Sequence, residues 1–393
     1  MAPQGLLTDY ERGTAMTRNL PIRRSPFCTS HIFVLLLTLA GLSVGCGTVP
    51  IGNPSPPSVS AIKGTVRIFT LPIAGSNPGA ITVGPDGNLW FTEVTATTNG
   101  PISKIGRISP SGTISDIPSS TLHGNLSSIA VGPDGNIWFI DGGLSQGGKI
   151  GRITPTGTIT EFPLPASNSD PSSITAGPDG NLWFTYGGFT QNGKIERITP
   201  MGTITEFPLP SSIAPGSITA GPDGSLWFTV TIIGPKTIAG PGPSGQIGRI
   251  TTTGEFSTYQ LQSDSKADSI TSGPDHNIWF SEEVLNNRSL SSKIGRITPA
   301  GTITEFTLPM GNPNGLNGGT VGITAGKDGA LWFTDAANNT IGRITTNGTI
   351  SQFTLPTPQS APESITSGPS GTLWFTEPGL NGQTGKIGRL TLA

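Results

Sequence analysis

Carboxylates that end short apolar segments are the residues of this chain whose type and spacing best suit chemistry. Five of them follow a Trp-Phe pair after one intervening residue: Glu93, Asp141, Glu282, Asp335 and Glu377. Two more, Asp268 and Glu363, stand fourteen residues before Glu282 and Glu377. Mg²⁺ and Ca²⁺ prefer oxygen ligands. We therefore predict that these seven carboxylates bind a ligand at one mouth of the fold, either the amine of a bound molecule or a divalent cation held by Glu282, Asp335 and Glu377.

A structural role competes with this interpretation for four of the acids. Lysine opens the segment that would pair with each of them, so that Glu93, Asp141, Glu282 and Glu377 face Lys104, Lys149, Lys293 and Lys386. Opposite charges that face each other across two strands form ion pairs. We prefer ion pairs for these four acids. Thr340 stands in the lysine position opposite Asp335, which makes Asp335 the acid predicted to be free.

The elements that must position these acids form a sevenfold repeat. Segments such as "GPDGNLWFT", which begins at Gly84, occur seven times and contain every tryptophan, at intervals of 42 to 53 residues. In the first copy, Ala80–Pro85 reads as a strand, "PDGN" as a turn and "LWFTE" as the returning strand. Lys104–Ser109 and Thr113–Pro118 read as a third and a fourth strand. Four strands at this period predict the blade of a β-propeller.

The ends of the chain predict how the ring closes. No fourth-strand segment follows the last "KIGRLTLA", whereas "TVRIFTLP", Thr65–Pro72, precedes the first tryptophan segment. Pairing of this N-terminal strand with Lys386–Leu392 would complete the last blade and remove an open edge. We therefore predict an all-β fold, a seven-bladed β-propeller of four-stranded antiparallel blades over 63–393, with the ring closed by the N-terminal strand.

Composition excludes one class of partner. The 393 residues include 56 Gly and 36 Pro, and the net charge is -2. The Lys and Arg residues are spread over the repeats rather than gathered in a basic patch, so nucleic acid is not an expected partner. We expect a monomer that binds a small molecule, a peptide or a glycan.

The N-terminus predicts export. Arg18, Arg23 and Arg24 precede an apolar run over 31–45 that is short for a membrane span and typical of a signal peptide. The run ends in "LSVGC", which resembles a bacterial lipobox and predicts lipidation of Cys46. We assign 1–46 to the signal peptide and 47–62 to a Pro/Ser-rich tether, which gives a lipoprotein on the periplasmic or extracellular face. A plain cleaved signal, an uncleaved anchor and a start at Met16 remain alternatives.

The repeat "ITVGPDGNLWFTE…KIGRI…ITEFPLP" resembles the streptogramin B lyase family, also called virginiamycin B lyases. The resemblance implies Mg²⁺-dependent ring opening of a cyclic depsipeptide by elimination. It also implies a catalytic His in "HGI", fourteen residues before the Glu of "WFTE". No blade has that His, because the matching residues are Gly79, Ser127, Ser172, Gly216, Asp268, Val321 and Glu363.

Three histidines remain as substitutes for the family base. His31 lies in the predicted signal and His276 in a turn at the opposite mouth, which leaves His123, with Asp141 and Glu93 as companions. Two functions follow. The chain is a ligand-binding propeller without the family chemistry, or it is a lyase with His123 as a displaced base. A lactone hydrolase with a central Ca²⁺ is less favoured, because the repeat lacks its usual Asn and Asp ligands.

Overall fold

The computed structural model describes residues 60–393 except 99–100, 118–121, 123, 143–146, 166–170, 187–192, 233–244, 263, 287–288, 310–318 and 380–381. By its internal contacts the chain divides into two units, Met1–Pro54 and Ser55–Ala393, and the second is the propeller. Within the described residues, no helix is long and apolar enough to cross a membrane.

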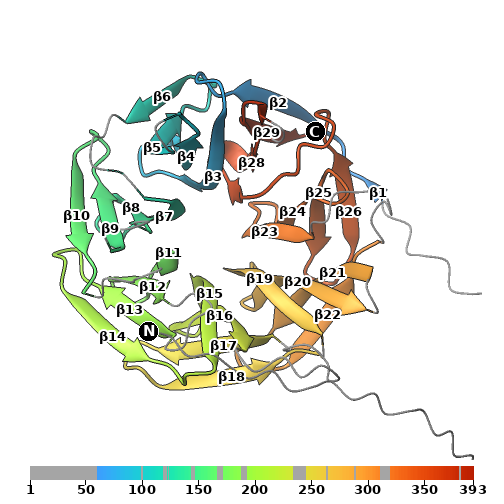
Figure 1. Cartoon of the computed structure of the whole chain (residues 1–393). Helices are drawn as coiled ribbons and strands as arrows, with labels where there is room; N and C mark the ends of the chain where they lie inside the picture. Colours follow the sequence, from blue (N-terminus) through green and yellow to red (C-terminus); the bar gives the residue numbers. More distant parts are fainter. Residues whose placement is uncertain are drawn as a thin grey trace, which may run out of the picture. The chain divides into compact units, whose positions relative to one another are not determined.

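Seven four-stranded blades form the ring, as the sequence predicts (Figure 1). From the centre outward, blade 1 has β3 (Ser76–Val83), β4 (Leu89–Thr95), β5 (Ile102–Ile108) and β6 (Ile114–Ile117). Blade 2 has β7 (Leu126–Val131), β8 (Ile137–Asp141), β9 (Lys149–Ile153) and β10 (Ile159–Pro163). Blade 3 has β11 (Pro171–Ala176), β12 (Leu182–Tyr186), β13 (Lys194–Ile198) and β14 (Ile204–Pro208). Blade 4 has β15 (Ile213–Ala220), β16 (Ser225–Ile232), β17 (Gln246–Thr251) and β18 (Phe256–Gln260).

The remaining blades follow the same antiparallel order. Blade 5 has β19 (Ser265–Ser272), β20 (Ile278–Asn286), β21 (Ser289–Ile297) and β22 (Ile303–Thr307). Blade 6 has β23 (Thr320–Ala325), β24 (Ala330–Asp335), β25 (Thr340–Thr345) and β26 (Ile350–Thr354). Blade 7 combines β27 (Ile365–Ser367), β28 (Leu373–Glu377) and β29 (Lys386–Leu392) with β2 (Gly64–Thr70), and a 3-10 turn, η1 (Pro369–Gly371), precedes β28.

The ring closes as the sequence predicts. The N-terminal strand β2 pairs with β29 in the register Thr65 to Thr391 through Thr70 to Lys386, which completes blade 7. A short strand, β1 (Ser60–Ala61), lies parallel to β26 and adds a fifth strand to blade 6 (Figure 1). Residues 60–62, which we assigned to the tether, thus pair with the propeller, because the outer edge of β26 offers unpaired backbone groups.

The repeated "PDGN" turn and the tryptophan form one hydrogen-bonded unit. In blade 1 the indole of Trp90 donates a hydrogen bond to Asp86 Oδ1 over 3.1 Å, and the same bond recurs in blades 2 to 6. Burial opposes ionisation of Asp86, but hydrogen bonds from Asn88 and Trp90 outweigh it and hold the pKa of Asp86 below its usual value. All seven tryptophans are at most 1% exposed and pack between neighbouring blades.

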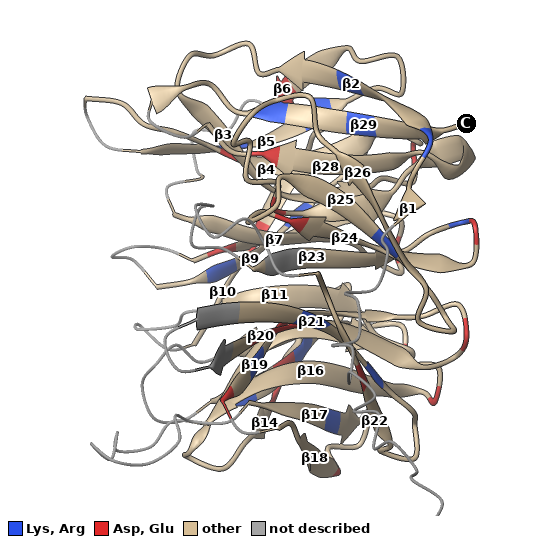
Figure 2. Ribbon diagram, turned by 90° about the vertical axis from the view of Figure 1, so that its right-hand side faces the viewer, with Lys and Arg blue, Asp and Glu red and all other residues tan. Residues whose placement is uncertain are grey.

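Charged residues do not gather on one side of the ring. Figure 2 shows Lys and Arg together with Asp and Glu on strands throughout the propeller. Many of them form ion pairs within a blade, such as Arg249 with Asp223 at 2.7 Å and Arg343 with Asp328 at 2.7 Å.

His276 replaces the glycine of the turn in blade 5 and adopts a φ of 58°. The other six turns have glycine there, with φ values of 72° to 76°. Because a side chain costs energy in the left-handed region, we expect His276→Gly to raise the free energy of unfolding by about 1 kcal/mol. Urea unfolding would measure it. His276→Ala, which removes the imidazole but keeps Cβ, should give no gain; an equal gain from Ala would contradict the backbone explanation.

Candidate functional site

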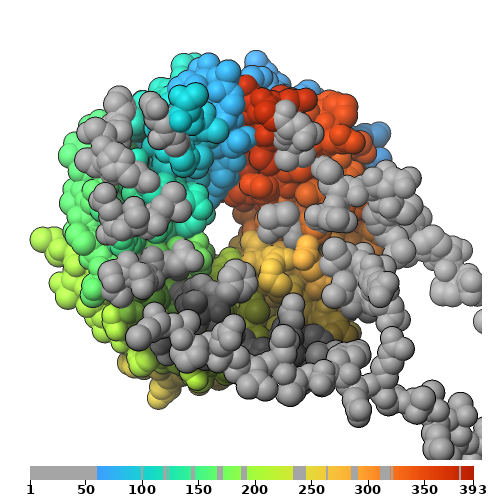
Figure 3. Space-filling view, in the orientation of Figure 1, coloured from blue at the N-terminus to red at the C-terminus, as the bar shows by residue number. Residues whose placement is uncertain are grey.

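A channel of about 430 Å³ runs along the inner strands at the centre of the ring. The space-filling view shows the opening (Figure 3). A β-bulge interrupts the pairing of the inner strand in blades 1 to 6, for example between Pro78 and Ile81 in blade 1. Residues inside these bulges line the channel, and in blades 1 and 3 to 6 a hydroxyl of the second strand accepts a hydrogen bond from the backbone of the bulge. In blade 1 the Thr92 hydroxyl accepts a hydrogen bond from the backbone N–H of Ala80.

Six of the seven positions that match the family histidine line this channel. The channel is lined by Gly79, Ala80, Ser127, Ser128, Ser172, Ser173, Gly216, Ser217, Asp268, Ser269, Gly322, Glu363 and Ser364. In blade 6 the lining residue is Gly322, the neighbour of Val321. The channel stays open because most of its lining residues are serine or glycine, whose side chains are short or consist of a hydrogen atom.

Asp268 and Glu363 are the two carboxylates among these lining residues, so the structure brings this part of the predicted set to one cavity. Lys266 lies 2.5 Å from Asp268 and neutralises part of its charge. The Glu363 side chain is exposed to the channel, yet the surrounding strands displace enough water to raise the pKa of its carboxyl. The channel therefore offers hydroxyl groups and at least one carboxylate to a ligand.

The five acids that end the second strands do not line this channel. Glu93, Asp141, Glu282, Asp335 and Glu377 are at most 2% exposed and lie within the blades. The prediction of an open mouth with seven carboxylates is therefore wrong for these five.

The predicted ion pairs have the correct register but the wrong partner. Glu93 lies opposite Lys104, and the matching residues of blades 2, 5 and 7 are also opposed. The lysine ammonium instead reaches an acid on the outer strand, with distances of 3.4, 3.0 and 2.5 Å in Lys104–Asp116, Lys149–Glu161 and Lys293–Glu305. The outer acid lies on the same face of the blade and is nearer to solvent, so its charge costs less to keep.

Asp335 is not the free acid that the sequence predicted. Its carboxylate accepts hydrogen bonds from the backbone and the side chain of Asn338, at 3.0 and 2.7 Å. Burial raises the pKa of Asp335, and these bonds act in the opposite direction. The turn that begins at Asp335 thus gives this acid hydrogen-bond partners within its own blade.

The metal prediction does not fit the described residues as a set. Glu282, Asp335 and Glu377 lie in three different blades, and no group of three His, Cys, Asp or Glu in the described ranges could hold a metal ion. His123 and Cys46 lie outside the described residues, so the structure places neither the predicted base nor the predicted lipidation site.

Two buried or half-buried acids were missed by the sequence interpretation. Glu196 replaces the glycine of "KIGRI" in blade 3 and lies 2.6 Å from Lys194, which also contacts Glu206 at 2.7 Å. Glu283 accepts a hydrogen bond from the backbone N–H of Gly319 in the segment before blade 6. The break of the "KIGRI" pattern was the signal for Glu196, whereas no repeat pattern marks Glu283.

Burial of Glu93 predicts a pH-dependent stability. Its carboxylate is fully buried and makes no hydrogen bond of standard geometry with the described residues. Burial raises the pKa of Glu93, and the Ser76 hydroxyl and Lys104 oppose that effect only in part. A raised pKa means that the stability contributed by this group is complete below the unfolded-state pKa of about 4.3 and is lost as pH rises through the folded-state pKa.

We therefore expect Glu93→Gln to raise the free energy of unfolding at pH 7 by about 1–3 kcal/mol. The gain should vanish below about pH 4, where the parent carboxyl is protonated in both states. Urea unfolding between pH 4 and 8 would measure it. Glu206→Gln is the control, because that side chain is 49% exposed. A gain that does not depend on pH would show that desolvation of the charge is not its cause.

Comparisons with known proteins agree with the fold and the repeat. The Virginiamycin B lyase family matches residues 59–240 and 241–393. A streptogramin B lyase structure is 36% identical, with a TM-score of 0.67, and the match covers 84% of this chain and 98% of that chain. A catalytically inactive His-to-Ala variant of virginiamycin B lyase from Staphylococcus aureus with quinupristin is 33% identical, with a TM-score of 0.67, covering 84% of this chain and 100% of that chain. No curated protein sequence matches. The chain belongs to the virginiamycin B lyase family.

Proposed function

We propose that this propeller binds a ligand in its central channel and does not carry out the family's elimination reaction. One observation supports the proposal most directly. At the seven positions that match the family histidine the chain has Gly, Ser, Val321, Asp268 and Glu363, and six of these positions line the channel. A missing general base lowers the rate of proton abstraction by about 10²–10⁴-fold.

The chemistry of the channel indicates the class of ligand. Serine hydroxyls both donate and accept hydrogen bonds, and the Glu363 carboxylate attracts a positive group. A ligand with an amine and several hydrogen-bonding groups, such as a small molecule, a peptide or an amino sugar, matches this lining. The channel volume of about 430 Å³ lies within the usual range for small-molecule sites.

The first experiment tests chemistry against binding. The chain over 47–393, which contains the whole propeller unit, is incubated with a cyclic streptogramin B, with Mg²⁺ or with a chelator. Ring opening by elimination gives a linear isomer of unchanged mass that chromatography separates from the substrate. We expect no isomer above the uncatalysed rate; an isomer that requires Mg²⁺ would overturn the binding-only proposal.

Membership of the family favours a second candidate, a lyase in which His123 replaces the matched base. His123 is the remaining histidine on the predicted active mouth, but it lies outside the described residues. If ring opening occurs, His123→Ala should abolish it while leaving the melting temperature unchanged. Activity that survives in this variant would exclude His123 as the base.

We also propose that the protein is an exported lipoprotein of the cell envelope. The support is the sequence alone: the apolar run over 31–45, the lipobox-like "LSVGC" and the Pro/Ser-rich segment after it. Mass spectrometry of the N-terminal peptide should find acyl chains on Cys46, and Cys46→Ser should release the protein from membranes. An unmodified Cys46 in the mature protein would contradict the anchor.

A further inference from the structure

The outer strands of the blades differ in how their free edges are protected. An unpaired edge invites another strand, and proteins commonly protect edges with charges or proline. Five outer strands contain a charged residue: Asp116 in β6, Glu161 in β10, Glu206 in β14, Glu305 in β22 and Arg67 in β2. The other two, β18 and β26, contain neither a charge nor a proline.

The chain itself covers one of these two unprotected edges. The strand β1 lies parallel to β26, in the register Ser60 to Ser351 and Ala61 to Gln352. The backbone N–H of Ile62 then donates a hydrogen bond to the carbonyl of Gln352 over 3.0 Å. The Ile62 side chain packs against the apolar cluster between blades 6 and 7. The unprotected edge of β26 therefore already accepts an extended segment.

The edge of β18 has the same geometry, and no strand among the described residues pairs with it. Among the described residues, β18 is the last strand of its sheet. Thr258 pairs with Gly248 as Gln352 pairs with Gly342 in blade 6. Because the registers match, the carbonyl of Thr258 faces outward as that of Gln352 does, and can accept the same hydrogen bond.

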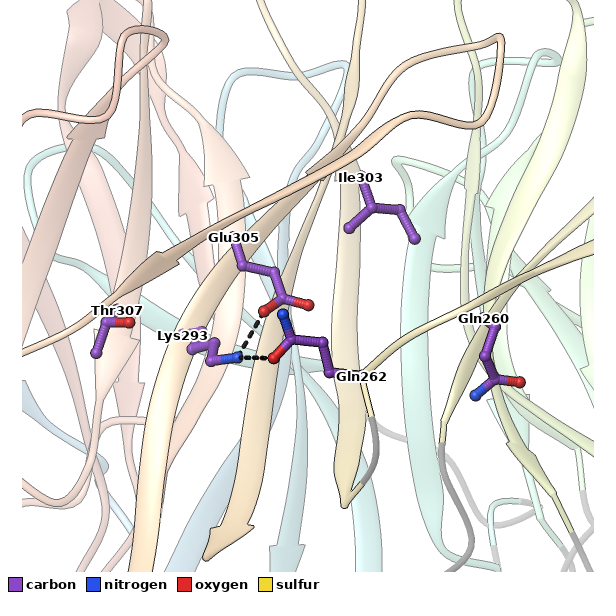
Figure 4. A pocket seen from close by; sticks show the side chains of 6 residues that line it. All are labelled: Gln260, Gln262, Lys293, Ile303, Glu305 and Thr307. Atoms are coloured by element: carbon purple, nitrogen blue, oxygen red, sulfur yellow. Dashed lines mark hydrogen bonds and ion pairs between the residues drawn. The ribbon is translucent and has the colours of Figure 1, made fainter. Parts of the chain in front are cut away.

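A cavity of about 500 Å³ lies where a side chain equivalent to Ile62 would enter. It is lined by Gln260, Gln262, Lys293, Ile303, Glu305 and Thr307 (Figure 4). The corresponding notch beside β1 is the groove between blades 6 and 7. There, Val66 and Ile68 stand at the positions of Ile303 and Glu305, and Pro356 stands at the position of Gln262. The notch beside β18 is therefore polar where the notch beside β26 is apolar.

The charges of this cavity are already paired. Figure 4 shows Lys293 between Glu305 and Gln262, with its ammonium 2.5 Å from Glu305 Oε2 and 3.2 Å from Gln262 Oε1. A charged guest would have to separate that ion pair. Side-chain amides and hydroxyls instead favour an uncharged guest that can donate and accept hydrogen bonds, such as Gln, Asn, Ser or Thr.

We propose that the outer edge of β18 binds an extended peptide segment in parallel, as β26 binds β1, with an uncharged polar side chain in the cavity beside Lys293 and Glu305. Main-chain hydrogen bonds along the edge would give affinity, and the cavity would give specificity for that one side chain. This interaction surface lies on the outer rim and does not depend on the function of the central channel.

The probe is a synthetic peptide that copies residues 58–64 with the change Ile62→Gln. Amide NMR spectra of the 47–393 chain should shift at β18 and not at β26. The same peptide with proline at the place of Ile62 lacks the N–H that would bond to Thr258, and we expect it to bind about tenfold more weakly. The unchanged peptide, with isoleucine there, should also bind more weakly at β18.

Variants of the protein test the same surface. Gln262→Pro gives blade 4 the residue that blades 2, 3 and 5 to 7 have at this position, and should weaken binding about tenfold without unfolding the protein. Thr258→Glu, which places on β18 the acid found in β10, β14 and β22, should do the same. Met201→Glu adds an equal charge at a residue that is 88% exposed in a distant turn, and should leave binding unchanged.

Three results would overturn the proposal. They are no change of any amide signal at millimolar peptide, a change of the β26 signals because the peptide displaces β1, or unchanged peptide affinity in both Gln262→Pro and Thr258→Glu. Light scattering provides a further test. If the protein forms dimers that Thr258→Glu abolishes, the edge serves pairing between two copies and not the binding of a separate peptide.

Discussion

Replacing Glu363 by histidine is expected to raise the rate of streptogramin B ring opening by about 10²–10⁴-fold over the unaltered chain. The change restores the family spacing, with a histidine fourteen residues before the Glu of "WFTE" at Glu377. The structure places the two positions side by side. The backbone N–H of Glu363 donates to the carbonyl of Thr376 over 3.0 Å, so residue 363 borders both the channel and the end of β28.

Two variants control this gain. Ser172→His places a histidine at the matching channel position of blade 3, where the second strand ends at Tyr186 and offers no carboxylate. Glu363→Gln removes the charge without adding a base. We expect neither to show ring opening in the chromatographic assay with Mg²⁺. Equal rates for both histidine variants would show that Glu377 is not needed, and no gain in either would show that the site lacks more than its base.

Removing β2 is expected to abolish cooperative folding. A chain that begins at Leu71 leaves β29 without its outer partner, and it loses the packing of Val66, Ile68 and Phe69 on the clusters at both faces of blade 7. These side chains are partly buried, so each contributes less than the roughly 1.5–3 kcal/mol of a fully buried one, and the pairing of β2 with β29 is lost with them. Their sum is comparable with a total stability of about 5–15 kcal/mol. Calorimetry and circular dichroism should show no cooperative transition.

The matched control begins at Lys63, which keeps β2 and removes only β1. This chain should unfold cooperatively with a small loss of stability, because β1 contributes only a two-residue parallel pairing and the contact of Ile62. If the chain from Leu71 also unfolds cooperatively at a similar temperature, closure by β2 is not required for the ring. The control also exposes β26, so the unchanged peptide 58–64, with isoleucine, should then bind at that edge.

Repetition separates the residues that build the ring from those that give it a function. The tryptophans, the turn aspartates and the lysine–acid pairs recur from blade to blade and stabilise each sheet against the next. Asp268 and Glu363 in the channel and the uncharged strand β18 on the rim break the pattern. These departures mark the two surfaces on which binding is proposed.

The sequence by itself determined the blades, their number and the closing strand. The tryptophan period and the alternation of turn and strand residues are local signals, and each blade needs only its own repeat and the next one to form. The pairing of Thr65 with Thr391 was predictable for the same reason, since one fourth strand was missing at the C-terminus and one was left over at the N-terminus.

Only the tertiary structure decided which acids line the channel. The sequence placed Glu93 and Glu377 at strand ends, but burial depends on what the neighbouring blade and loops cover, and both are closed off. It placed Lys149 opposite Asp141, yet the flexible lysine side chain reaches Glu161 on the next strand, where a charge stays nearer to water. Alternation along a strand fixes the face on which a side chain lies; the packing of separate segments determines what it touches.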